Sequence, residues 1–194
     1  MKAAVLYSGG KDSSLAAVML ERLDFEVELY TVNFGVYDSY VPAAESAKSL
    51  GFKHRVLKMD KKILKKTCEM IIVDGFPNEG IKYIHQKTVE HLAKDHDIIA
   101  DGTRRDDRTP KLNVNQIRSL EDRFNIHYIN LDSFGHKSVK FISENLFEIS
   151  KEKSRRDASS DFEVEIRVMI DEMGSDSLKF FPEHYQTRVI GYKK

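Results

Sequence analysis

The turn that follows the first apolar run of this chain carries an unusual set of residues. Residues 3–7 and 15–20 are apolar, and between them stand Ser8, Gly9, Gly10, Lys11, Asp12, Ser13 and Ser14. A short apolar run followed by helical spacing predicts a buried strand, a tight turn and a helix. This turn constrains the fold most, because it places two glycines, a lysine and three hydroxyls at the start of a helix.

The composition of this turn is typical of a phosphate-binding site. Glycine lets the backbone approach an anion closely, and the free N–H groups and positive dipole of the following helix favour negative charge. Lys11 adds a cation and the serines add hydroxyl donors. Asp12 would repel phosphate, unless it holds Mg²⁺ between protein and nucleotide. An ordinary helix-capping turn is the alternative, although capping requires neither paired glycines nor a lysine beside an aspartate.

This segment resembles the PP-loop, written SGGKDS, of the adenine nucleotide alpha hydrolase-like superfamily. It is not a Walker A loop, because Asp12 stands where that motif needs Ser or Thr. The resemblance implies cleavage of ATP between its α and β phosphates, with the loop holding the departing pyrophosphate. It is specific over residues 3–20 and looser over the first 135 residues. It identifies a superfamily and leaves the acceptor substrate open.

The order of apolar patterns predicts alternating strands and helices. We expect strands at 3–7, 27–34, 55–59, 97–100 and 127–131, and helices at 12–23, 42–50, 61–73, 80–94, 115–124 and 137–149. This order predicts an α/β fold with a doubly wound, Rossmann-like parallel sheet and helices on both faces. We expect a nucleotide-binding domain over 1–135 and a small C-terminal extension over 136–194, packed on the same domain and ending in a strand from Tyr185.

Composition narrows the class of protein. The chain has 194 residues, and its 31 basic and 31 acidic residues give no net charge, so it lacks the global basic field of many nucleic-acid-binding proteins. No apolar run is long enough to cross a bilayer, which predicts a cytoplasmic protein with no membrane partner. Cys68 is the one cysteine, which excludes an intrachain disulfide and a cysteine zinc cluster. Its place on an apolar helical stripe favours a core position over a nucleophile.

A second polar segment follows the fourth expected strand. It contains Gly102, Thr103, Arg104, Arg105, Asp106 and Asp107 within an expected loop over 101–113, and parallel topology returns it to the same sheet edge as the first turn. The resemblance implies that the glycine admits phosphate or ribose closely, that either arginine stabilises phosphate charge, and that either aspartate shares Mg²⁺. A solvated loop with internal ion pairs is the alternative.

The resemblance implies an ATP site drawn from both segments and from the second strand. The expected ATP contacts are Tyr7, Ser8, Gly9, Gly10, Lys11, Asp12, Ser13, Ser14, Val32, Asn33, Phe34, Gly102 and Thr103. Catalysis is assigned to Lys11, Asp12, Arg104 and Arg105, and Mg²⁺ to Asp12, Asp106 and Asp107. Phe34 also fits a core position, which its aromatic character favours. In the tail, His184, Gln186 and Arg188 are conceivable substrate contacts, but a final strand explains their spacing better.

The expected reaction is an AMP-forming activation. A carbonyl or carboxylate oxygen attacks the α-phosphorus of ATP, pyrophosphate leaves, and a nitrogen or sulfur nucleophile then displaces AMP. Balanced charge favours a small-molecule acceptor over tRNA, so tRNA-base modification is one alternative, and a non-catalytic ATP- or AMP-sensing module is another. No glutaminase pattern is present, so a separate ammonia or sulfur donor protein is an expected partner, and a homodimer is compatible with the chain.

Overall fold

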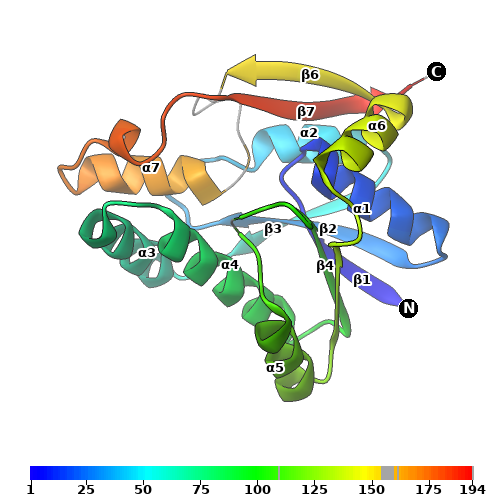
Figure 1. Ribbon diagram of the computed structural model, residues 1–194, viewed down its shortest axis with the longest axis horizontal. Coiled ribbons are helices and arrows are strands. Elements are labelled where there is room, and N and C mark those ends of the chain that lie inside the picture. Colours follow the sequence, from blue (N-terminus) through cyan, green and yellow to red (C-terminus); the bar gives the residue numbers. More distant parts are fainter. Residues whose placement is uncertain (109, 154–159, 161, 194) are drawn as a thin grey trace.

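Five parallel strands form the central sheet of the computed structural model, which describes residues 1–108, 110–153, 160 and 162–193 (Figure 1). They are β1 (Lys2–Leu6), β2 (Glu26–Asn33), β3 (Lys53–Lys58), β4 (Ile98–Arg104) and β5 (His127–Leu131), in the order β3-β2-β1-β4-β5. Ala3 pairs with Val27 on one side and with Ile98 on the other. The chain winds in opposite directions from β1, and such a switch point opens a crevice beyond the carboxyl ends of the strands.

Helices cover both faces of this sheet, as the sequence predicted. They are α1 (Lys11–Arg22) and α2 (Val41–Ser49) on one face, and α3 (Lys61–Asp74), α4 (Asn78–Leu92) and α5 (Val114–Phe124) on the other. Ala3 and Val5 of β1 pack in the first layer, whereas Ala4 and Leu6 pack in the second. Alternate residues of a strand point to opposite faces, so a continuous apolar strand is required at this central position.

The part of the chain after β5 consists of α6 (His136–Leu146), β6 (Phe147–Lys153), α7 (Phe162–Glu172), the short 3₁₀ helix η1 (Ser177–Lys179) and β7 (Tyr185–Tyr192). It covers α1 and α2 with α6 and a hairpin, and packs α7 against α3 and the end of β2. Strands β6 and β7 pair antiparallel and lie across the outer side of α1 and α2 (Figure 1). None of the helices in the described residues is long and apolar enough to span a bilayer.

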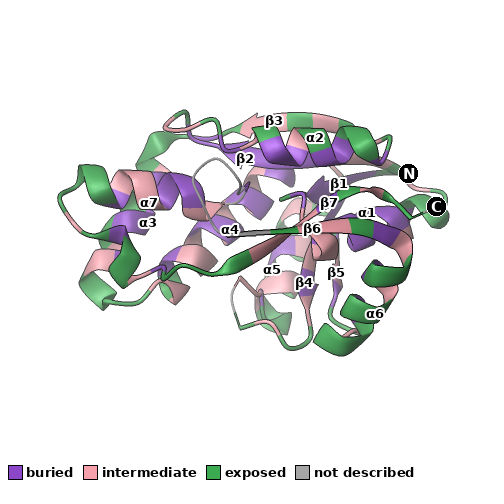
Figure 2. Cartoon of the chain, turned by 90° about the horizontal axis from the view of Figure 1, so that it is seen from above, coloured by how far each residue is buried: buried purple, intermediate pink, exposed green. Residues whose placement is uncertain are grey.

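Helix α1 is buried from two sides by this arrangement. Ala17 and Leu20 pack toward the sheet, while Leu15 and Val18 pack in the cluster of α6 and the hairpin. In Figure 2 the buried colour follows α1 and α2, whereas α6 shows a mostly exposed surface. Burial on two sides fixes the position of α1, and therefore of the turn at its amino end.

Glu165 of α7 holds the C-terminal region against the end of β2. Its side chain is only 1% exposed, and it accepts hydrogen bonds from the N–H groups of Phe34, Val36 and Tyr37 at 2.8, 2.9 and 3.3 Å. Burial raises the pKa of Glu165, although these N–H donors act in the opposite direction. The three N–H donors lie just after the end of β2. Glu165 therefore accepts the hydrogen bonds that a neighbouring strand would otherwise accept.

The structure corrects two expected boundaries and adds one helix that was not expected. Residues 101–104 continue β4 through a register shift and are not part of a loop. The helix expected at 137–149 ends at Leu146, because Phe147 turns extended and pairs with Tyr192. The sequence showed no regular element where α7 lies. The final strand from Tyr185 is confirmed.

Replacing Glu165 tests its role as a tertiary anchor. We expect Glu165→Ala to lower the free energy of unfolding by about 3 kcal/mol, because buried N–H donors lose their acceptor. Chemical denaturation at neutral pH measures the change. Glu172→Ala on the exposed side of the same helix is the control and should change stability little. Equal effects of the two substitutions would contradict this role.

Candidate nucleotide-binding site

The turn between β1 and α1 has the conformation that its glycines predict. Gly9 has φ +76°, and a Cβ placed there would lie 3.2 Å from the Cα of Ala43 and 3.3 Å from the Cβ of Ser46. Gly10 is the N-cap residue of α1, and no side chain caps the helix. The N–H groups of the first turn are therefore left for a ligand, at the positive end of the helix dipole.

The turn is anchored to the core by hydroxyl groups and by the C-terminal hairpin. The hydroxyl of Tyr7 lies 3.0 Å from that of Ser14 and 2.8 Å from that of Ser46. The carbonyl of Gly9 accepts hydrogen bonds from the Ser46 hydroxyl at 3.3 Å and from the N–H of Val189 at 2.9 Å. The loop conformation is thus set before any ligand binds, which lowers the entropy that binding has to overcome.

A cavity of about 320 Å³ opens beside this turn at the carboxyl ends of β1, β2 and β4. This volume is at the lower end of the range for small-molecule sites. Its walls combine apolar side chains with hydroxyl and carboxylate groups. The lining residues are Leu6, Tyr7, Ser8, Asp12, Ser13, Tyr30, Thr31, Val32, Ile81, His85, Asp101, Gly102, Thr103, Asp107, Pro110, Ser160, Phe162 and Glu163.

Gly102 lets β4 lie directly against the first turn of α1. A Cβ built on Gly102 would lie 2.5 Å from the backbone N of Ser13 and 2.6 Å from the carbonyl carbon of Asp12. Real Cβ atoms are essentially never found so close to backbone atoms. Gly102 is therefore required for packing, because only a residue without a Cβ lets the two segments meet. Sequence reasoning did not identify this role.

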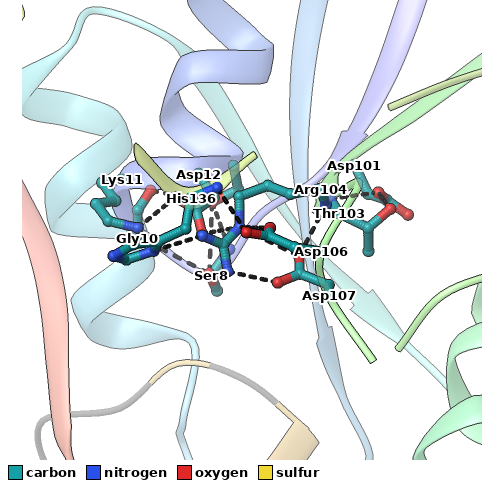
Figure 3. A network of polar contacts seen from close by, with 11 residues as sticks. Ser8, Gly10, Lys11, Asp12, Asp101, Thr103, Arg104, Asp106, Asp107 and His136 are labelled. Atoms are coloured by element: carbon teal, nitrogen blue, oxygen red, sulfur yellow. Dashed lines mark hydrogen bonds and ion pairs between the residues drawn. The ribbon is translucent and has the colours of Figure 1, made fainter. Parts of the chain in front are cut away.

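Arg104 connects the two segments by ion pairs (Figure 3). Its guanidinium Nε lies 3.4 Å from Oδ2 of Asp12, its Nη2 lies 2.5 Å from Oδ1 of Asp107, and its Nη1 donates to Nδ1 of His136 at 2.7 Å. The Lys11 ammonium lies 2.5 Å from the other oxygen of Asp12. Burial by itself would lower the pKa of Arg104, but the neighbouring carboxylates outweigh burial and raise it. The cation therefore stays charged within this network.

The three carboxylates expected at magnesium are arranged around Arg104. Asp106 Oδ1 lies 4.0 Å from its Nε, and the Oδ2 of Asp106 accepts a hydrogen bond from the N–H of His136 at 2.8 Å. No three of the described His, Cys, Asp or Glu side chains could hold a metal ion together. A metal site made by protein ligands alone does not fit. Asp12 and Asp107 line the cavity. Two carboxylates are enough where the phosphates of a bound nucleotide supply the other Mg²⁺ ligands.

A buried cluster around Asp101 forms part of the cavity floor. Asp101 Oδ1 accepts hydrogen bonds from the N–H and hydroxyl of Thr103 at 2.8 and 2.7 Å. Oδ2 lies 3.0 Å from Nε2 of His85 and accepts a hydrogen bond from the Tyr128 hydroxyl. Burial alone would raise the pKa of Asp101, but these hydrogen bonds outweigh it and lower the pKa. The ionised carboxylate fixes the positions of two cavity residues, His85 and Thr103.

The expected ATP residues divide into those that line the cavity and those that support it. Seven of them line it, namely Tyr7, Ser8, Asp12, Ser13, Val32, Gly102 and Thr103, and so does Asp107, which was expected at Mg²⁺. Ser14 and Phe34 are buried beside it, and Asn33 hydrogen bonds to the carbonyl of Tyr37. Lys11 lines a neighbouring groove. Arg104 supports Asp12, while Arg105 is exposed beside Gly135.

Sequence reasoning missed several cavity residues. His85, Ile81 and Phe162 lie on helices that carry no motif, and Ser160 precedes a helix that the sequence did not indicate. Their contribution depends on long-range packing, so no local signal identifies them.

The core position predicted for Cys68 is confirmed. Its side chain is fully buried, and burial raises the pKa of its thiol to about 12.

Alanine at Gly102 tests the contact between the two segments. We expect Gly102→Ala to lower the free energy of unfolding by about 2 kcal/mol, because a methyl group there overlaps the backbone of α1. Gly191→Ala is the matched control, since a Cβ there meets nothing within 4 Å. Denaturation curves of both variants give the comparison. A fully stable Gly102→Ala protein would disprove the close approach.

The lowered pKa of Asp101 predicts a pH-dependent contribution to stability. Its stabilisation is complete above the ordinary carboxyl pKa of about 3.9 and is lost as the pH falls through its lower folded value. We expect Asp101→Asn to lower stability by about 2 kcal/mol at neutral pH and by progressively less in acid. Urea denaturation over a pH series measures this, with the exposed Asp122→Asn as control. A difference independent of pH would contradict the prediction.

Comparison with known proteins places this chain in a family. Residues 1–191 match the model of a family of unknown function, DUF7411. An uncharacterized protein of Methanocaldococcus jannaschii is 50% identical over 195 residues, covering 100% of this chain and 98% of that protein. A crystal structure from the same organism, described as a predicted subunit of tRNA methyltransferase, is 49% identical with a TM-score of 0.94, covering 100% of this chain and 99% of that one. The chain therefore belongs to the DUF7411 family.

Proposed function

We propose that this protein binds ATP at the turn between β1 and α1 and activates an acceptor by transferring AMP to it. The observation that carries the proposal is the uncapped amino end of α1, with Lys11 beside it, opening into a cavity at the switch point of the sheet. Such a helix end attracts phosphate, and α/β sheets bind ligands at this position. The resemblance of the turn to the PP-loop supplies the reaction class.

The adenosine half of ATP fits the apolar part of the cavity. Val32 lies at the carboxyl end of β2, while Ile81 and Phe162 come from α4 and α7. These side chains provide apolar surface for a purine ring, and His85 and Thr103 provide polar groups that can orient the nucleoside. Glu165 supports this proposal indirectly, because it holds α7 against the end of β2.

The phosphate half would lie along the turn. N–H groups of α1, the hydroxyls of Ser8 and Ser13, and the ammonium of Lys11 are donors of the kind that stabilise a departing pyrophosphate. Arg104 is held against Asp12 by its ion pairs, so its role in this proposal is to position that carboxylate. Mg²⁺ brought with the nucleotide would be held by Asp12 and Asp107 together with phosphate oxygens, and would neutralise phosphate charge.

The acceptor favoured by the comparisons is a tRNA base. The sequence alone favoured a small molecule, because the chain has no net charge. A relative that is 49% identical over the whole chain is described as a predicted subunit of tRNA methyltransferase, and this description supports both an RNA substrate and a partner protein. In the proposed reaction a base carbonyl oxygen bonds to the α-phosphorus, and the bond to the bridging oxygen breaks with its electrons on pyrophosphate.

Ligand binding and turnover test the proposal together. By calorimetry we expect Lys11→Ala to weaken ATP binding about tenfold or more, since a charge-assisted phosphate contact is lost, and to change adenosine binding little. Lys62→Ala, an exposed lysine of α3, is the control. S-adenosylmethionine shares the adenosine group but has no phosphate, so it should bind more weakly than ATP. With ATP labelled at the α-phosphate and bulk tRNA, we expect labelled AMP or adenylylated RNA, lost in Asp12→Ala.

The outcomes separate the candidate functions. ATP binding without AMP formation in the presence of tRNA or metabolite extract would favour the sensing module over the enzyme. Binding of S-adenosylmethionine together with no affinity for ATP would overturn the proposal in favour of a methyl-donor site. Unchanged ATP binding by Lys11→Ala would show that the phosphates lie elsewhere.

A further inference from the structure

We propose that a basic groove on the opposite side of the turn from the cavity binds the phosphate backbone of an RNA substrate. The groove has a volume of about 630 Å³ and is bordered by Lys11 of α1, by α6, β6 and β7, and by Lys193 beyond β7. This inference rests on the proposed function, because it names the surface that would hold the RNA while its base reaches ATP. Of the motif residues 8–14, Lys11 alone lines this groove.

Cations from four separate parts of the chain meet at this groove. They are Lys11 of α1, which is also paired with Asp12, Lys140 of α6, Lys151 of β6 and Lys193 beyond β7. Glu144 is the one carboxylate among the groove residues, and it lies 3.9 Å from Lys140. In the described part of the chain, no carboxylate forms an ion pair with Lys151 or Lys193. The chain has no net charge, but this groove forms a local positive surface. Such a surface attracts anions.

The position of the groove connects it to the proposed ATP site. Lys11 lines the groove, while the next residue, Asp12, lines the cavity. Thr187 of β7 also lines the groove, and its carbonyl oxygen would lie 3.5 Å from a Cβ on Gly10. The same turn therefore separates the two spaces. A polyanion in the groove would lie against the turn from the side of the hairpin.

The size and chemistry of the groove favour RNA over a small anion. Its volume is about twice that of the cavity, and its exposed lysines come from the hairpin as well as from α6. Pyrophosphate needs only the end of the groove near Lys11. Lysines spread over several elements are typical of contacts with a phosphodiester backbone, which position the nucleic acid without reading its sequence.

Neutralising the outer lysines tests this inference. In the triple variant Lys140→Gln, Lys151→Gln, Lys193→Gln, we expect tRNA affinity to fall about tenfold or more at near-physiological salt. We expect the slope of log affinity against log salt to become shallower by about 2, because fewer counterions are released. Binding is measured by fluorescence anisotropy with labelled bulk tRNA in the absence of ATP. The matched control, Lys48→Gln, Lys62→Gln, Lys94→Gln, removes the same charge from exposed positions outside the groove.

Two further measurements separate this inference from the proposed function. ATP affinity of the groove variant should equal that of the wild type, which also shows that the variant is folded. Equal loss of tRNA affinity in both triple variants, or tRNA binding unaffected by either, would overturn the groove as an RNA site. Binding of inorganic pyrophosphate that the groove variant loses, together with no tRNA affinity in the wild type, would assign the groove to a small anion. A failure of ATP binding in the wild type would refute the proposed function without changing these RNA results.

Discussion

The close contact between Gly102 and the first turn of α1 is the constraint on which the candidate site depends. It brings the end of β4 within van der Waals distance of the backbone of Asp12 and Ser13. The cavity, the Arg104 ion pairs and the Asp101 cluster all lie around this contact. Because interiors are close-packed, a small displacement here would move every one of these groups.

The C-terminal region contributes to the site although it carries none of the motif residues. β7 donates a backbone hydrogen bond to Gly9, and Glu165 of α7 holds the segment after β2. Helix α7 also supplies Phe162 to the cavity. The region therefore supports the turn from outside and completes the cavity wall, so preorganisation of the site is distributed over the whole chain.

The ion pairs around Asp12 show how one network can serve two purposes. Without ligand, Lys11 and Arg104 balance the carboxylate, which avoids an unpaired charge in a partly buried position. A bound triphosphate would offer Lys11 a second anion, and the arginine would remain paired with Asp107. In the proposed complex Arg104 would therefore still pair with Asp12.

The sequence by itself determined the strand, turn and helix over residues 3–20, the alternation of strands and helices along the chain and the buried state of Cys68. These features depend on local periodicity and glycine chemistry. It could not indicate α7, whose buried Glu165 interrupts the apolar pattern, or the strand at Phe147, which forms only by pairing with Tyr192. Tertiary structure alone decided that Gly102 packs against α1 and that His85 meets Asp101. Such contacts join residues far apart in the chain, and no local pattern records which distant residues folding will bring together.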